Sequence, residues 1–94
     1  MKRQGKILTE TLKIKLSNIR EINDFNAVLQ RCSVEECRIT CGSRIVNAIS
    51  YLGLLSVKNQ LLAGVDATFK ISDDKAMTLF GLIDKYIVSG MVMI

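Results

Sequence analysis

Ser50 is the side chain of this sequence that is most clearly placed for chemistry. It lies within VNAISYLGLL (residues 46–55), between an expected strand and a short apolar run. A serine in this position caps a helix, because its hydroxyl accepts a hydrogen bond from an amide of the first turn. The same hydroxyl could accept a phosphoryl group, whose charge would lie at the positive end of the helix dipole. Spacing alone favours the cap.

The cysteines Cys32, Cys37 and Cys41 form a second candidate group. They lack the Cys-x2-Cys spacing of a structural zinc site, and the sequence contains no histidine to complete one. Cys37 and Cys41 share the apolar parity of a strand, and Cys32 lies on the apolar side of a helix. No basic side chain is placed to activate a thiol, so we interpret all three as reduced core residues. No metal or other cofactor is expected.

Hydrophobic periodicity predicts the elements that position these residues. Period-two alternation indicates four strands, over residues 8–16, 36–41, 44–47 and 65–71, with Glu10 interrupting the first. Gly42-Ser43 has the composition of a two-residue hairpin turn. Apolar stripes with a helical period predict helices over residues 22–32, 50–57 and 72–87, the last with Ser72 as its N-cap. Residues 58–64 are predicted to be a loop.

Composition and charge exclude several classes of function. The net charge is +4, and the first 20 residues hold six basic side chains against Glu10 alone. This basic cluster has no aromatic residues interleaved with it, so a nucleic-acid partner is not expected. No apolar segment follows the charged N-terminus, so no signal peptide is expected. Asp84 and Lys85 interrupt the apolar C-terminal segment, which argues against a membrane span. The apolar tail 91–94 either completes the core or joins a neighbouring subunit.

Two blocks of sequence carry a resemblance to a known family. KIKLSNIREINDFNAVL (residues 13–29) resembles the end of the first strand and the first helix of the HPr phosphocarrier family of the bacterial sugar phosphotransferase system. VNAISYLGLLS (residues 46–56) resembles that family's regulatory segment, in which Val-Asn-x-Lys-Ser leads into a short apolar helix. The likeness spans roughly residues 7–88. It implies one α+β domain over residues 1–94, an HPr-like open-faced β-sandwich of order β-α-β-β-α-β-α. Its four-stranded antiparallel sheet would be covered on one face by three helices.

The sequence departs from this family at the phosphoryl-carrying site. The family places a histidine at the start of the first helix, within a Gly-x-His-x-Arg-Pro motif. The matching residues here are IREIND (19–24), so that Glu21 replaces the histidine, Asn23 the arginine and Asp24 the proline. Phosphohistidine chemistry is therefore excluded, and an enzyme of this type is not expected. Glu21 is either a fixed negative charge that imitates the phosphorylated state or a surface residue of a lost active site.

The resemblance also implies a role for the Ser50 block. In many HPr-like proteins this serine is both a helix cap and a kinase target, although Ile49 here replaces the lysine that usually precedes it. The short helix docks partner proteins in the family, so Tyr51, Leu52 and Leu55 are expected to bind partners, together with Glu21. Leu52 and Leu55 are expected to reach solvent.

Two hypotheses for function follow. The first is a non-catalytic regulatory or protein-interaction module of the bacterial cytoplasm, phosphorylated on Ser50. Its expected partners are proteins, an HPr-type serine kinase or a transcriptional regulator, and its expected state is a monomer or weak homodimer. The alternative is a phosphoryl carrier or transfer protein that uses Glu21 or a cysteine as the acceptor.

Overall fold

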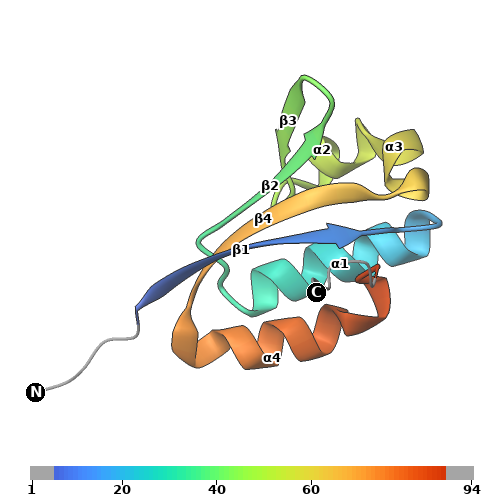
Figure 1. Ribbon diagram of the computed structural model, residues 1–94. Helices are drawn as coiled ribbons and strands as arrows, with labels where there is room; N and C mark the ends of the chain where they lie inside the picture. The colour runs from blue at the N-terminus through green and yellow to red at the C-terminus, as the bar shows by residue number, and fades with distance from the viewer. Residues whose placement is uncertain (1–5, 89–94) are drawn as a thin grey trace, which may run out of the picture.

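The computed structural model of the protein describes residues 6–88. The elements are β1 (Ile7–Ile14), α1 (Ile19–Arg31), β2 (Glu36–Cys41), β3 (Arg44–Asn47), α2 (Tyr51–Leu55), α3 (Lys58–Ala63), β4 (Val65–Ser72), α4 (Asp73–Ile83) and the 3-10 turn η1 (Asp84–Tyr86). Strands and helices are mixed along the chain, and the fold is α+β (Figure 1).

The four strands form one antiparallel sheet in the order β1-β4-β2-β3. Strand β4 therefore lies between β1 and β2, and β1 and β3 form the two edges among the described strands (Figure 1). In the β2–β3 hairpin Cys41 pairs with Arg44, which leaves Gly42-Ser43 as the turn. Gly42 has a φ of 62°, a conformation that glycine adopts without steric cost. The predicted antiparallel sheet and hairpin are confirmed.

One face of the sheet is covered and carries the core. Val65, Ala67, Phe69 and Ile71 of β4 are buried, and the residues between them are not. Helices α1 and α4 lie side by side below the strands in Figure 1 and contact each other. The Phe25 ring of α1 meets the Phe69 ring edge to face, with the centroids 6.3 Å apart. Burial of this apolar surface is the main source of stability.

The other face of the sheet is open and polar. Lys13 Nζ lies 3.3 Å from Asp66 Oδ1, and Lys70 Nζ lies 3.7 Å from Glu36 Oε1, each pair reaching across neighbouring strands. Exposed ion pairs of this kind contribute at most about 1 kcal/mol each. These pairs therefore support the strand register and add little to stability.

The prediction of a loop over residues 58–64 is wrong, because helix α3 occupies Lys58–Ala63 and Gly64 is its C-cap. Val57 precedes the helix and provides no side-chain cap, and Leu61 is its only buried residue. Neither a capping residue nor an apolar stripe therefore marked this helix in the sequence. The described chain has four helices, one more than predicted.

The last helix begins where the sequence predicted and ends earlier. The Ser72 hydroxyl makes no capping bond to an amide of α4 and instead donates to Asp74 Oδ1 at 2.7 Å, so the predicted hydroxyl cap is wrong. After α4 and η1 the chain runs along β1, where Ile87 forms a bridge opposite Ile14.

The predicted tail 91–94 lies outside the described residues. Across residues 6–88, no helix combines the length and apolar character needed to cross a membrane.

Candidate functional site

The chain before Ser50 is folded by a series of local hydrogen bonds. At the end of β3, the Asn47 side chain accepts a hydrogen bond from the Ile49 amide at 3.0 Å, and the Asn47 carbonyl accepts one from the Ser50 amide at 3.2 Å. Ser50 then caps α2, its Oγ accepting from the Gly53 amide at 3.2 Å. Asparagine and serine favour such turns and caps because their short polar side chains reach nearby main-chain groups. The capping role predicted for Ser50 has the expected geometry.

Gly53 is required where α2 meets the end of β3. A Cβ atom at this position would lie 2.6 Å from the Asn47 carbonyl oxygen, closer than a carbon and an oxygen can approach. The pattern Asn-x-x-Ser-x-x-Gly (47–53) is therefore a unit, with a turn residue, a cap and a residue that permits close packing.

Helix α1 holds this unit from below. Asn26 is buried, and its Nδ2 donates to the carbonyls of Ala48 at 3.1 Å and Ile49 at 2.9 Å. Gln30 Nε2 in turn donates to Asn26 Oδ1 at 3.0 Å. Two carbonyls of the chain leading to Ser50 are thus satisfied by one side chain from another element. The position of Ser50 is fixed by α1 as well as by its own helix.

The outer surface of α2 is partly apolar and open to solvent. Leu52 is 75% exposed, while Leu54 on the opposite side is fully buried. Ser50 is exposed, and Tyr51 and Leu55 are half-buried against the core. The predicted exposure of Leu52 is confirmed, and that of Leu55 is partial. A serine hydroxyl and an exposed leucine therefore lie within one turn of each other on a helix with a fixed position.

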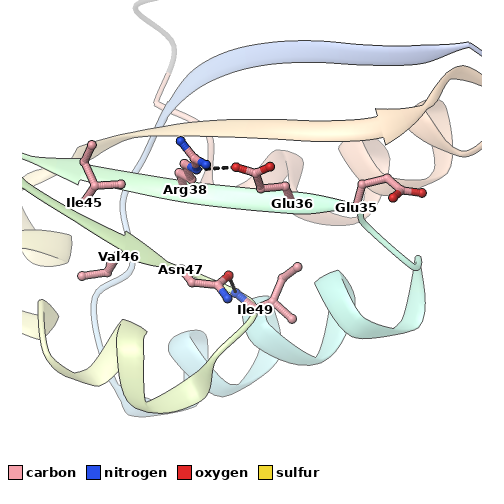
Figure 2. Close-up of a pocket in the computed structure, with 7 residues that line it drawn as sticks. All are labelled: Glu35, Glu36, Arg38, Ile45, Val46, Asn47 and Ile49. Atoms are coloured by element: carbon pink, nitrogen blue, oxygen red, sulfur yellow. Dashed lines mark hydrogen bonds and ion pairs between the residues drawn. The ribbon is translucent and has the colours of Figure 1, made fainter.

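A hollow lies beside this segment, at the β3 edge of the sheet. Its volume is about 370 Å³, and its lining residues are Glu35, Glu36, Arg38, Ile45, Val46, Asn47 and Ile49 (Figure 2). Arg38 is its single basic residue, and the guanidinium pairs with the Glu36 carboxylate. The mixed lining has no free cation directed at a phosphate, and the hollow is open to solvent. It lies beside the Ser50 segment, and its lining residues do not indicate a particular ligand.

Glu21 has a local structural role at the start of α1. Its amide donates to Asn18 Oδ1 at 2.9 Å, and its own Oε1 accepts from the Ser17 amide at 2.7 Å. This reciprocal arrangement is a form of capping box, which satisfies amides that a helix start leaves unpaired. Glu21 lies about 7.5 Å along the helix from Asn26, at 1.5 Å per residue. In the described chain no hydrogen bond or ion pair joins it to the Ser50 segment.

Asn23 and Asp24, which stand at the arginine and proline positions of the compared motif, have different surroundings. Asn23 is exposed. Asp24 Oδ2 accepts a hydrogen bond from the Tyr86 hydroxyl at 2.6 Å and lies 3.7 Å from Lys85 Nζ. Burial, this hydrogen bond and the nearby carboxylates raise the pKa of the Tyr86 phenol above its ordinary value. The start of α1 is thus tied to η1 through Asp24.

The cysteines lie in or beside the core, as predicted. Cys32 and Cys37 are buried, and Cys41 is half-buried. Burial raises the pKa of the Cys37 thiol far above its ordinary value, and burial also raises that of Cys41 against an opposing effect of Arg44. These two thiols are therefore protonated and weakly nucleophilic at neutral pH. Among the described residues no group of three or more cysteine or acidic side chains is arranged to hold a metal ion.

Comparison with known proteins gave no relatives: no family model, curated protein or solved structure matches this chain.

Sequence reasoning missed Asn26 and the role of Gly53. Asn26 stands among the apolar residues of α1, between Phe25 and Val28, and a polar residue in that stripe requires a buried partner. This signal was present in the sequence, although the partner carbonyls lie on a different element. The contact at Gly53 depends on how α2 folds back on β3, which no local pattern specifies.

Proposed function

We propose that this chain is a non-catalytic HPr-like protein, a regulatory or protein-interaction module that presents the Ser50 segment (residues 47–55) to a partner protein. The observation that carries the proposal is the exposed Ser50 hydroxyl beside the exposed Leu52, on a segment held by Asn26. An exposed apolar side chain next to polar groups is the usual form of a protein-docking site. The cytoplasm, where thiols stay reduced, is the proposed location.

Ser50 is the proposed site of regulatory phosphorylation by an HPr-type serine kinase. A phosphate on this hydroxyl would carry close to two negative charges at the start of α2, where the helix amides favour an anion. It would also change the charge beside Leu52 without requiring a new fold. A partner such as a transcriptional regulator could then distinguish the two forms by charge.

The alternative of a phosphoryl carrier on Glu21 or a cysteine has less support. The Glu21 carboxylate is engaged by the Ser17 amide, and the Cys37 thiol is buried. Incubation with labelled phosphoenolpyruvate and the general phosphotransferase enzyme tests this alternative. Transfer of label to the chain would favour it over the regulatory role.

Phosphorylation is tested with purified HPr-type serine kinase and ATP, read by intact mass. We expect one phosphoryl group on the wild-type chain and none on Ser50→Ala. Ser56→Ala is the matched control, because Ser56 is an exposed serine at the other end of α2. An unshifted wild-type mass, or a shift that survives in Ser50→Ala, would contradict the proposal.

Docking is tested with the same kinase as the probe. Leu52→Asp should lower kcat/KM for phosphorylation by about tenfold or more, since an anchor residue at an interface contributes roughly 1–2 kcal/mol or more. Met77→Asp is the control, because Met77 is 83% exposed and lies on α4. Equal effects of the two substitutions would show that α2 is not the docking surface.

A further inference from the structure

The outer edge of β1 has main-chain groups that no other described residue engages. The Lys15 amide donates to Tyr86 O at 2.9 Å, and Lys13 O accepts from the Val88 amide at 2.8 Å. The main-chain amides and carbonyls of odd-numbered residues on this strand therefore point away from β4. By this alternation the amides and carbonyls of Ile7, Thr9 and Thr11 also point outward. Within residues 6–88 no hydrogen bond engages these groups. A strand edge whose main-chain groups have no partner among residues 6–88 can pair with another strand.

Glu10 is the residue of this edge that the fold leaves unexplained. It shares the parity of Leu8 and Leu12, which are half-buried and pack against the core on the helix-covered side. Glu10 itself is exposed and has no ion pair among the described residues.

Lys6 lies on the same side, two residues before Leu8. Lys6 O accepts a hydrogen bond from the Asp73 amide at 2.8 Å, so the pairing of β1 with β4 continues to this residue. Lys6 is exposed and also has no ion pair among the described residues. The edge thus presents the order cation, leucine, anion at alternate positions.

We propose that two copies of this chain associate through their β1 edges, as antiparallel strands related by a two-fold axis at Leu8. In this register Leu8 lies opposite Leu8 of the second copy, and Lys6 lies opposite Glu10 on both sides of the axis. Ile7 exchanges main-chain hydrogen bonds with Thr9 of the second copy. The two sheets become one continuous sheet.

Charge selects this register from its neighbours. An axis at Glu10 would place two carboxylates directly opposite each other, and an axis at Thr9 would place Glu10 opposite Leu8. The axis at Leu8 makes two pairs of opposite charge and one apolar pair, which are the favourable cross-strand combinations. The β1 edge is therefore complementary to itself, which indicates a second copy of the chain as its binding partner.

The inference does not depend on the proposed function. Helix α2 contacts β3, which lies at the other edge of the sheet from β1 (Figure 1). Pairing through β1 therefore leaves Ser50 and Leu52 of both copies free, and the dimer would present two such segments.

Sedimentation equilibrium from micromolar to millimolar concentration tests the proposal. The wild-type chain should show a monomer–dimer equilibrium. Glu10→Lys should raise the dimer dissociation constant by about tenfold or more, because two attractive cross-strand pairs become repulsive. Glu35→Lys changes the net charge equally at an exposed position away from β1 and should leave dimerisation unchanged.

Two further variants keep the test decisive. The double substitution Lys6→Glu with Glu10→Lys should restore the dimer, because the charge pairs are re-formed in the opposite sense. Thr9→Pro removes an outward amide and should give a folded monomer by circular dichroism.

The proposal is overturned by a wild-type chain that stays monomeric at all concentrations. It is also overturned by a dimer that survives Glu10→Lys, or by failure of the charge swap to restore association. Slow amide exchange of Thr9 and Thr11 in a monomeric wild type would show that another segment, such as residues 89–94, occupies the edge, and would likewise overturn it.

Discussion

Replacing Gly53 by alanine tests whether the Ser50 segment is held as tightly as the structure indicates. The new Cβ would lie 2.6 Å from the carbonyl oxygen of Asn47. The obstructing atom belongs to the main chain at the end of β3, so it cannot rotate away as a side chain would. Either β3 or α2 must shift.

The expected magnitude is the difference between two opposing effects. Overpacking of this kind costs about 1–3 kcal/mol. Alanine is favoured over glycine in a helix by about 1 kcal/mol, which offsets part of that cost. The net loss is therefore at most about 2 kcal/mol, which corresponds to a fall in melting temperature of up to about 16 °C for a chain of this size.

Gly81→Ala is the matched control, because Gly81 lies in helix α4 and nothing occupies the space of its Cβ within 4 Å. There only the helix preference operates, and a stabilisation of about 0.5–1 kcal/mol is expected. Urea denaturation of both variants measures the two free energies of unfolding. Opposite signs support the reasoning; a Gly53→Ala variant as stable as Gly81→Ala would refute it.

Three further predictions concern the contacts around the same segment and the end of the described chain. Asn26→Ala should lower the free energy of unfolding by about 1–3 kcal/mol in urea, because the buried Ala48 carbonyl loses its side-chain donor. Gln30→Ala changes an exposed neighbour and should cost clearly less; equal losses would contradict the role of Asn26. Ser50→Ala should cost about 1 kcal/mol by removing the cap, while Ser50→Asp keeps it; equal melting temperatures for the two would be inconsistent with capping. Because the pKa of Tyr86 is raised in the folded state, the unfolded chain loses the phenol proton first, so stability should fall as pH rises above about 10. Tyr86→Phe should show a smaller fall in a pH series of thermal melts, and an identical pH dependence would show that this phenol is not responsible.

The sequence predicted the strands better than the short helices. Alternation in β4 and the Gly42-Ser43 turn follow from burial and backbone sterics within a few residues, so they can be read locally. Helix α3 could not be read in this way, because it has one buried residue and no cap. Its stability comes from tertiary contacts, which short helices depend on.

The candidate site was predicted only in part, because some of its contacts are local and others join different elements. The cap at Ser50 is local and has the expected geometry. The spacing Asn18-x-x-Glu21 is also a local capping signal. Because Glu21 matches the phosphoryl-carrying histidine of the compared family, it was assigned to that site and not to the helix cap. The hold of Asn26 on the carbonyls before Ser50 joins different elements, and no pattern within either element specifies it.

The central place of β4 has a consequence for how the chain folds. Ile7 pairs with Ser72, and β4 also provides the partner of β2, so the sheet closes through contacts between residues far apart in sequence. During synthesis β1 has no strand to pair with until β4 has left the ribosome, and its apolar side stays uncovered over that interval. Closing such long loops is slow, because the entropy is lost before the contacts form. Refolding should therefore be limited by the docking of β1 on β4, with the β2–β3 hairpin and α1 forming earlier.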